Sequence, residues 1–129
     1  MLAGLRILVV DDDADTRHLE KIVFTRAGAV VAEAASAAVA FLTLRDFKPH
    51  LVVSDVDMPK EDGCSLIRRI RALGADLGGA IPAIAVSGGA SGSARLEALR
   101  AGFSAHLAKP VAVAELLGTV MALSLGVVR

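Results

Sequence analysis

One short apolar run, which ends in a carboxylate, constrains the fold of this chain more than any other feature. Residues 51–54 read Leu-Val-Val-Ser, and Asp55 follows directly. Pro49 and Pro59 bound the run. A run of this length with β-branched residues and flanking prolines predicts a short buried strand. Asp55 then lies at the carboxyl end of a central strand, where open parallel α/β sheets bind their ligands. A lone aspartate there would more often cap a loop, so its neighbours decide the interpretation.

Other apolar runs of the chain end in polar or small residues in the same way. They are residues 7–10 before Asp11-Asp12-Asp13, residues 81–86 before Ser87-Gly88-Gly89, and the weaker run 105–108 before Lys109-Pro110. Because the carboxyl ends of parallel strands meet at one edge of a sheet, we expect acids, a hydroxyl and an ammonium group to gather there.

Helical patterns separate these runs, and a further short strand is expected at residues 30–32. Asp13 and Ser36 are suited to cap the first two helices. The apolar positions expected on the buried faces of the first three helices are Leu19, Ile22, Val23, Val39, Phe41, Leu42, Leu44, Leu66, Ile67, Ile70 and Leu73. The arginines that lie between the apolar positions of the third helix are interpreted as ordinary surface residues. Strands that alternate with helices predict a doubly wound α/β fold, a parallel sheet with helices on both faces.

Composition limits the class of protein. The 129 residues are expected to form a single domain, residues 1–129, and the single cysteine, Cys64, excludes a disulfide within the chain and suits a reducing compartment. With 14 basic and 14 acidic residues, the chain has no general attraction to nucleic acid or to an anionic membrane. No signal peptide is recognisable, and the longest uncharged apolar stretch, 13 residues at 116–128, is shorter than the roughly 20 needed to span a bilayer. We therefore expect a cytoplasmic protein.

The acids expected at the sheet edge indicate a metal site. Asp11, Asp12 and Asp55 would repel one another strongly at neutral pH unless a cation lay among them. A group of oxygen ligands without a nearby histidine or cysteine suits a hard ion such as Mg²⁺.

The same edge suits phosphoryl chemistry. One carboxylate, with its charge balanced by a metal ion and by Lys109, could accept a phosphoryl group as an aspartyl phosphate. Lys109 would neutralise one phosphoryl oxygen and the hydroxyl of Ser87 would donate to another. Gly88 lacks a side chain, so its backbone N–H is expected to be open to the incoming group.

With these residues in view, the chain resembles the receiver domain of two-component response regulators from residue 7 to about residue 125. The resemblance is carried by Val9-Val10-Asp11-Asp12-Asp13, by Asp55-Val56-Asp57-Met58-Pro59 followed by Asp62-Gly63, by Ser87, and by Lys109-Pro110. Each motif alone is weak, but all four in this order are specific. The resemblance implies a flavodoxin-like, five-stranded parallel sheet of order 2-1-3-4-5 and a cis peptide bond between Lys109 and Pro110.

The resemblance also implies a role for each site residue. Asp55 would be the phosphoacceptor, Asp12 and Asp55 would bind Mg²⁺ directly, and Asp11 would bind it largely through water. Asp57 would offer the metal its backbone carbonyl. The phosphate contacts would be Ser87 and Lys109. The donor would be a phosphohistidine of a sensor kinase or phosphotransfer protein, and the domain would catalyse its own phosphorylation and dephosphorylation without being a turnover enzyme.

Some positions depart from the family pattern. His106 stands where the family usually has a tyrosine or phenylalanine that swings inward on activation, so the switch residue differs here. Asp57 adds negative charge where hydrolytic water approaches, which affects the lifetime of the phosphoryl group. Val111 replaces the aromatic residue common after Lys-Pro, which removes packing but no chemistry.

Two other functions remain open from the sequence. A phosphatase of the haloacid dehalogenase type also uses Asp-x-Asp after a strand, but there the motif follows the first strand and more chain follows it. A protein-binding module that has lost phosphorylation would not need every chemical position filled, as they are here.

The final helix, expected at residues 113–125, predicts a contact surface. Leu116, Val120 and Leu123 are enough to cover the sheet, yet further apolar residues surround the helix and no charge lies between Glu115 and Arg129. Such a helix normally has a polar outer face. We expect the fourth helix, fifth strand and final helix to bind a downstream protein or a second copy, with Met121 at the centre. Since no effector domain follows Arg129, we expect a stand-alone regulator, a phosphorelay shuttle or a receiver excised from a hybrid kinase.

Overall fold

Strands and helices alternate along the whole chain in the computed structural model, which describes residues 1–88 and 92–125. The strands are β1 (Arg6–Val10), β2 (Val30–Ala34), β3 (Leu51–Asp55), β4 (Ala83–Ser87) and β5 (Ala105–Ala108). The helices are α1 (Ala14–Arg26), α2 (Ala37–Phe47), α3 (Gly63–Arg71), α4 (Gly92–Ala101) and α5 (Val113–Ser124), with a short 3₁₀ helix, η1 (Ala75–Leu77), before β4. Residues 89–91, which include Gly89 and Ser91 of the expected loop after β4, lie outside the described residues.

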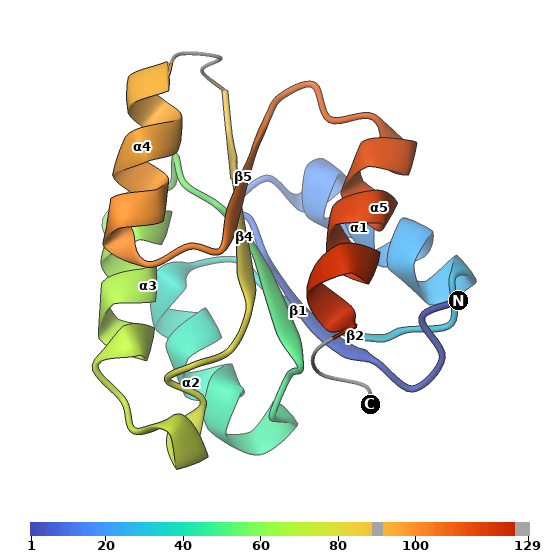
Figure 1. Ribbon diagram of the computed structural model, residues 1–129, viewed down its shortest axis with the longest axis horizontal. Helices are drawn as coiled ribbons and strands as arrows, with labels where there is room; N and C mark the ends of the chain where they lie inside the picture. Colours follow the sequence, from blue (N-terminus) through green and yellow to red (C-terminus); the bar gives the residue numbers. More distant parts are fainter. Residues whose placement is uncertain (89–91, 126–129) are drawn as a thin grey trace.

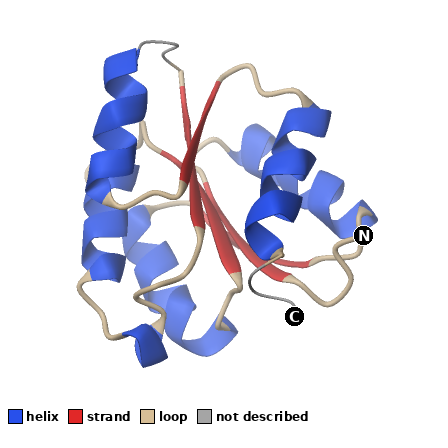
Figure 2. Ribbon diagram, in the orientation of Figure 1, coloured by secondary structure: helices blue, strands red, loops and turns tan. Residues whose placement is uncertain are grey.

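The strands form one parallel sheet in the order β2-β1-β3-β4-β5, which confirms the predicted topology. Helices α1 and α5 cover one face of the sheet and α2, α3 and α4 cover the other (Figures 1 and 2). Each face has its own apolar cluster. On the α1/α5 side it includes Phe24, Leu116 and Val120. On the opposite side it includes Leu44, Leu66 and Ile70. Both faces are therefore buried, as parallel sheets require.

Short polar side chains begin the helices that lead away from the sheet edge. Asp13 caps α1 by accepting the backbone N–H of Thr16, and Ser36 caps α2 by accepting that of Val39, as predicted. Asp62 caps α3 in the same way. Each carboxylate or hydroxyl satisfies a helical N–H that has no partner within its helix.

The predicted buried faces are right for α3 and partly wrong for α1 and α2. Leu19 on α1 is 59% exposed and Leu42 on α2 is 74% exposed, and Ile22 and Val39 are exposed as well. The residues that α1 and α2 do bury are Phe24, Ala37, Ala40 and Leu44. Alanines occupy most of the buried positions of α2, whereas Val39 and Leu42 turn outward. Among the arginines expected at the surface, Arg71 is only partly exposed and donates to the carbonyls of Gly79 and Gly102.

Two further features bear on the predictions. The peptide bond between Lys109 and Pro110 is cis, as predicted. None of the helices within residues 1–88 and 92–125 has the length and apolar character that a crossing of the bilayer requires.

Candidate functional site

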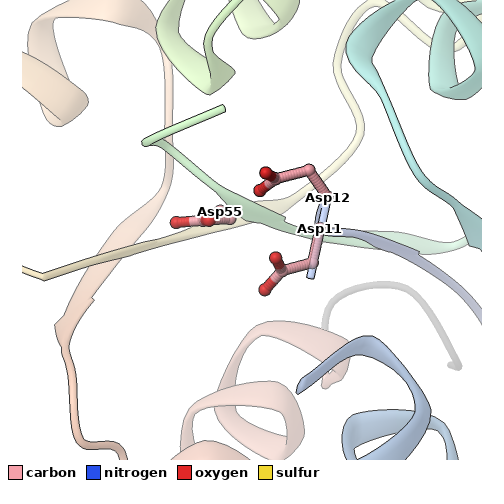
Figure 3. Close-up of side chains that lie close together, drawn as sticks. All are labelled: Asp11, Asp12 and Asp55. Atoms are coloured by element: carbon pink, nitrogen blue, oxygen red, sulfur yellow. The ribbon is translucent and has the colours of Figure 1, made fainter. Parts of the chain in front are cut away.

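Three carboxylates meet where β1 and β3 end. Asp11 and Asp12 follow β1 directly and Asp55 is the last residue of β3. One carboxylate oxygen from each lies within 4.8 Å of the others, and in Figure 3 the three groups face the same side. The structure thus brings together the acids that the sequence placed at this edge.

Backbone contacts hold the two buried acids in place. Asp11 is buried, and its Oδ1 accepts the N–H of Asp13 at 2.9 Å. Arg17 donates to the backbone carbonyl of Asp11 at 2.8 Å and reaches Glu33 on β2 with its Nε at 3.2 Å. Asp55 is only 5% exposed. The carboxylate and the backbone carbonyl of Asp11 therefore both have donors within the chain.

Lys109 supplies the positive charge of the site. Its ammonium lies 3.3 Å from Oδ1 of Asp55, and its backbone N–H donates to the carbonyl of Ser87 at 2.8 Å. Burial opposes the charge on this ammonium, but the neighbouring carboxylates of Asp55 and Asp11 outweigh it and raise the pKa of Lys109. The lysine therefore stays charged beside the predicted acceptor.

The acids are not fully neutralised by this one lysine. Burial raises the pKa of Asp55, the charge of Asp11 raises it further, and Lys109 only partly offsets both. Burial likewise raises the pKa of Asp11, against the hydrogen bond from Asp13 and the charge of Lys109. A group of carboxylate oxygens with excess negative charge, two of its three acids buried, is the donor set that a hard divalent cation prefers. The residues present fit Mg²⁺.

Ser87, at the end of β4, has a partner that the sequence did not predict. Its hydroxyl oxygen lies 2.6 Å from Nε2 of His106 on β5. Ser87 pairs with Ala108 and Ala85 pairs with His106 in the sheet register, so both side chains stand on the face covered by α4. The hydroxyl predicted to bind phosphate and the residue predicted to act as the switch are thus in direct contact.

The side chain of Asp57 also makes an unexpected contact. Its Oδ2 accepts the backbone N–H of Gly88 at 3.3 Å, and its own N–H donates to Oδ1 of Asp55 at 3.3 Å. The Gly88 N–H, expected to be open, already has an acceptor in this state. An incoming phosphoryl group would have to displace that carboxylate.

Gly63 explains why α3 can begin so close to Asp55. A Cβ atom on Gly63 would lie 2.5 Å from the carbonyl oxygen of Asp55 and 2.9 Å from Cα of Val56. Only glycine therefore fits where the helix meets the strand end. The Asp62-Gly63 pair in the sequence was the signal for this packing.

Glu20 on α1 is a further acid that sequence reasoning missed. It lines a pocket of about 430 Å³ together with Lys109 and mostly apolar residues such as Val86 and Leu116. Burial, with the charges of Asp11 and Asp55, raises the pKa of Glu20 to about 7, although Lys109 opposes the shift. In the sequence Glu20 looks like an ordinary surface residue of a helix, and only the packing of α1 reveals its surroundings.

Fold and site together define a doubly wound α/β protein with an acidic, lysine-containing ligand site at its strand ends. The family described as the response regulator receiver domain matches residues 7–121. An uncharacterised 14.6 kDa protein of Leptolyngbya boryana is 46% identical over 116 residues, which are 90% of this chain and 87% of that protein. The transcriptional regulatory protein PrrA of Mycobacterium tuberculosis is 35% identical over 118 residues, 92% of this chain and 49% of PrrA.

A solved structure agrees with this assignment. The receiver domain of the Francisella response regulator 1452 superimposes with a TM-score of 0.87 at 27% identity, and the match covers 96% of this chain and 99% of that one. The chain therefore belongs to the receiver domains of two-component response regulators, which are signalling modules and not turnover enzymes. It spans about half the length of PrrA. The family assignment removes the haloacid dehalogenase alternative.

Proposed function

We propose that this chain, as one receiver domain, accepts a phosphoryl group from a phosphohistidine onto Asp55 and passes the signal to a protein partner. The observation that carries the proposal is the contact at 3.3 Å between the Lys109 ammonium and the buried Asp55, beside two further acids. A structural ion pair would need one carboxylate for one lysine. Here the extra acids leave excess negative charge that an added cation would balance.

Magnesium is the cation that we assign to this site. Asp12 and Asp55 would bind Mg²⁺ directly, Asp11 largely through water, and Asp57 through its backbone carbonyl. When bound, the ion would withdraw negative charge from the phosphoryl group and from the acceptor carboxylate.

The residues of the chain would divide the transfer step among them. An oxygen of Asp55 attacks phosphorus, a P–O bond forms, and the P–N bond of the donor breaks. The donor imidazole leaves with the electron pair of that bond and takes up one proton. Lys109 and Asp57 both contact Oδ1 of Asp55, which leaves Oδ2 for the attack. Lys109 and Ser87 then bind phosphoryl oxygens, which stabilises the charge that develops on them.

The partners follow from the same proposal. The donor is a sensor histidine kinase or a phosphotransfer protein, and the receiving partner is a downstream protein or a second copy of this chain. We place the receiving surface on α4, β5 and α5, where Leu96, Val113 and Met121 are exposed apolar residues. His106 belongs to β5 of this surface and its Nε2 contacts the hydroxyl of Ser87 at 2.6 Å, so we assign it as the switch residue.

Labelling with a small acyl phosphate tests the proposed function. We expect the wild-type chain to take up one phosphoryl group in the presence of Mg²⁺, and Asp55→Asn to take up none. Mass spectrometry of the intact chain measures the uptake. No labelling of the wild-type chain would identify a receiver that has lost phosphorylation, and continuous turnover of the donor without labelled protein would identify a phosphatase.

A further inference from the structure

The contact between Ser87 and His106 limits how the proton of the serine can be used, and the following inference rests on the proposed function. The serine oxygen and Nε2 of His106 are 2.6 Å apart, a distance typical of a strong hydrogen bond. Ser87 is buried, His106 is partly buried, and the neighbouring residue on this face, Ala85, is small and fully buried. The hydroxyl of Ser87 is thus shielded from solvent, and the imidazole of His106 is partly shielded.

The chemistry of the two groups allows either direction of donation in the unphosphorylated chain. A serine hydroxyl has one proton and can also accept hydrogen bonds, and a neutral imidazole has one nitrogen that donates and one that accepts. Ser87 can donate to Nε2, or Nε2 can donate to Ser87. The contact is satisfied both ways.

Phosphorylation removes this freedom. Near neutral pH the oxygens of a phosphoryl group act almost entirely as acceptors, so a serine that binds one of them must donate its single proton to it. The serine oxygen then offers His106 only lone pairs. A bond of 2.6 Å can persist only if Nε2 carries a proton.

We infer that His106 is a positioning residue whose Nε2–H donates to Ser87 in the phosphorylated chain and directs the serine proton at the phosphoryl group. The neutral tautomer with its proton on Nε2 is sufficient for this donation. It can form by exchange with solvent, since one proton leaves Nδ1 and another binds Nε2, so the imidazole takes up no net proton. A phenylalanine or tyrosine at this position could fill the space. Neither could make this donation from a ring nitrogen.

The direction of the hydrogen bond can be measured directly by nitrogen NMR of the imidazole. The probe is fluoroberyllate with Mg²⁺, a non-reactive analogue of the phosphoryl group. We expect the Nε2 resonance of His106 in the complex to show a directly bonded proton. The chain has three histidines, so His106→Gln assigns the signal by its loss. An unprotonated Nε2 in the complex would overturn the inference.

Matched variants test the effect on binding. His106→Phe keeps a ring but removes the donor, and we expect it to weaken fluoroberyllate binding by about 2- to 12-fold, the range that one net hydrogen bond supports. His106→Gln, whose amide nitrogen can donate, should restore most of that affinity. His18→Phe, which changes an exposed histidine of α1, should have no effect and serves as the control.

A double variant separates positioning from simple packing. If His106 acts through the serine, His106→Phe should have no effect in a Ser87→Ala background. An equal loss in both backgrounds would overturn the inference, as would unchanged affinity of His106→Phe. Failure of the proposed function would differ from all of these, because the wild-type chain would then neither bind fluoroberyllate nor be labelled at Asp55.

Discussion

Asp12 differs from its two acidic neighbours because it is exposed to solvent. Asp11 and Asp55 are buried and already have donors within the chain, whereas Asp12 can turn toward an added ion without breaking such contacts. A divalent ion held by one carboxylate and water would bind little better than to free aspartate. We therefore propose that Mg²⁺ binding depends on Asp12 and Asp55 jointly.

We accordingly predict that Asp12→Ala weakens Mg²⁺ binding by at least about tenfold, as expected when one of two directly bound carboxylates is lost. Asp55→Ala should have a similar effect. Isothermal titration with MgCl₂ measures both, and Asp76→Ala, at an exposed acid of η1, is the control. If Asp12→Ala binds Mg²⁺ as tightly as the wild-type chain, Asp12 does not belong to the site.

Asp57 yields a prediction from its contact with Gly88. The carboxylate occupies an N–H that a phosphoryl oxygen would use, and it adds like charge near the acceptor. Removing one charge at an exposed position near the acceptor changes a barrier by about 1 kcal/mol, so Asp57→Ala should be labelled by a small acyl phosphate about fivefold faster. Initial rates by mass spectrometry measure this. A slower or equal rate would show that the Asp57 side chain does not obstruct the site.

At the scale of the elements, strands were easier to predict than helix faces. The run that ends in Asp55 predicts a strand unambiguously, because prolines bound it and its residues favour strands. In α2, by contrast, both Ala40 and Leu42 are apolar, and hydrophobicity alone favours burying the larger side chain. The helix buries the alanine because the packing of α2 against the sheet sets the rotation of the helix about its own axis. The local sequence pattern contains no information about this packing.

The last helix supports a prediction about association. Met121 is 41% exposed on α5, while Leu116 and Val120 are buried beneath it. Met121→Glu should therefore leave the fold and the labelling of Asp55 intact and weaken dimerisation or partner binding by about tenfold or more, as for a central residue of an interface. Sedimentation of the phosphorylated chain and binding to a true partner measure the effect.

The control for that experiment is Leu42→Glu, which introduces the same charge at an exposed apolar residue of α2. It should not change association. If Met121→Glu behaves like this control, the apolar residues of α5 only cover the domain and do not form an interface.

At the scale of the whole molecule, Glu20 should affect the pH dependence of stability. Its pKa is raised to about 7 in the folded chain from an ordinary value of 4.5, so the folded state holds the proton more tightly than the unfolded state. The contribution of Glu20 to the free energy of unfolding then falls as pH rises from about 4.5 to about 7, and the loss is complete above that range.

We predict that Glu20→Gln, without Mg²⁺, is more stable than the wild-type chain by about 1 to 3 kcal/mol at pH 8. At pH 4 the two should be nearly equal. Urea denaturation across this range measures the difference, and Glu97→Gln, at an exposed acid of α4, is the control. A constant difference at all pH values would show that Glu20 does not titrate as described.

The whole fold was more predictable than the detail of its site. The alternation of strands and helices predicted a doubly wound parallel sheet with Asp11, Asp12, Asp55 and Lys109 at one edge. The sheet order followed from the resemblance to receiver domains that four motifs carry. Two contacts could not be predicted. The contact of Ser87 with His106 depends on the register and side-chain rotamers of β4 and β5, and that of Asp57 with Gly88 depends on how the loops after β3 and β4 approach each other. The roles of these residues in phosphorylation stay predictions until labelling tests them.

The crowding of Asp11, Asp12 and Asp55 also affects how such a chain can evolve. Without a cation, the folded state has to bring together carboxylates that the unfolded chain keeps apart. A neutral residue at position 55 should therefore raise the free energy of unfolding of the metal-free domain and leave the domain unable to signal. Selection for robustness and selection for signalling therefore act in opposite directions at this one edge of the sheet. A descendant released from its signalling role would be expected to lose these acids early, while both apolar clusters persist.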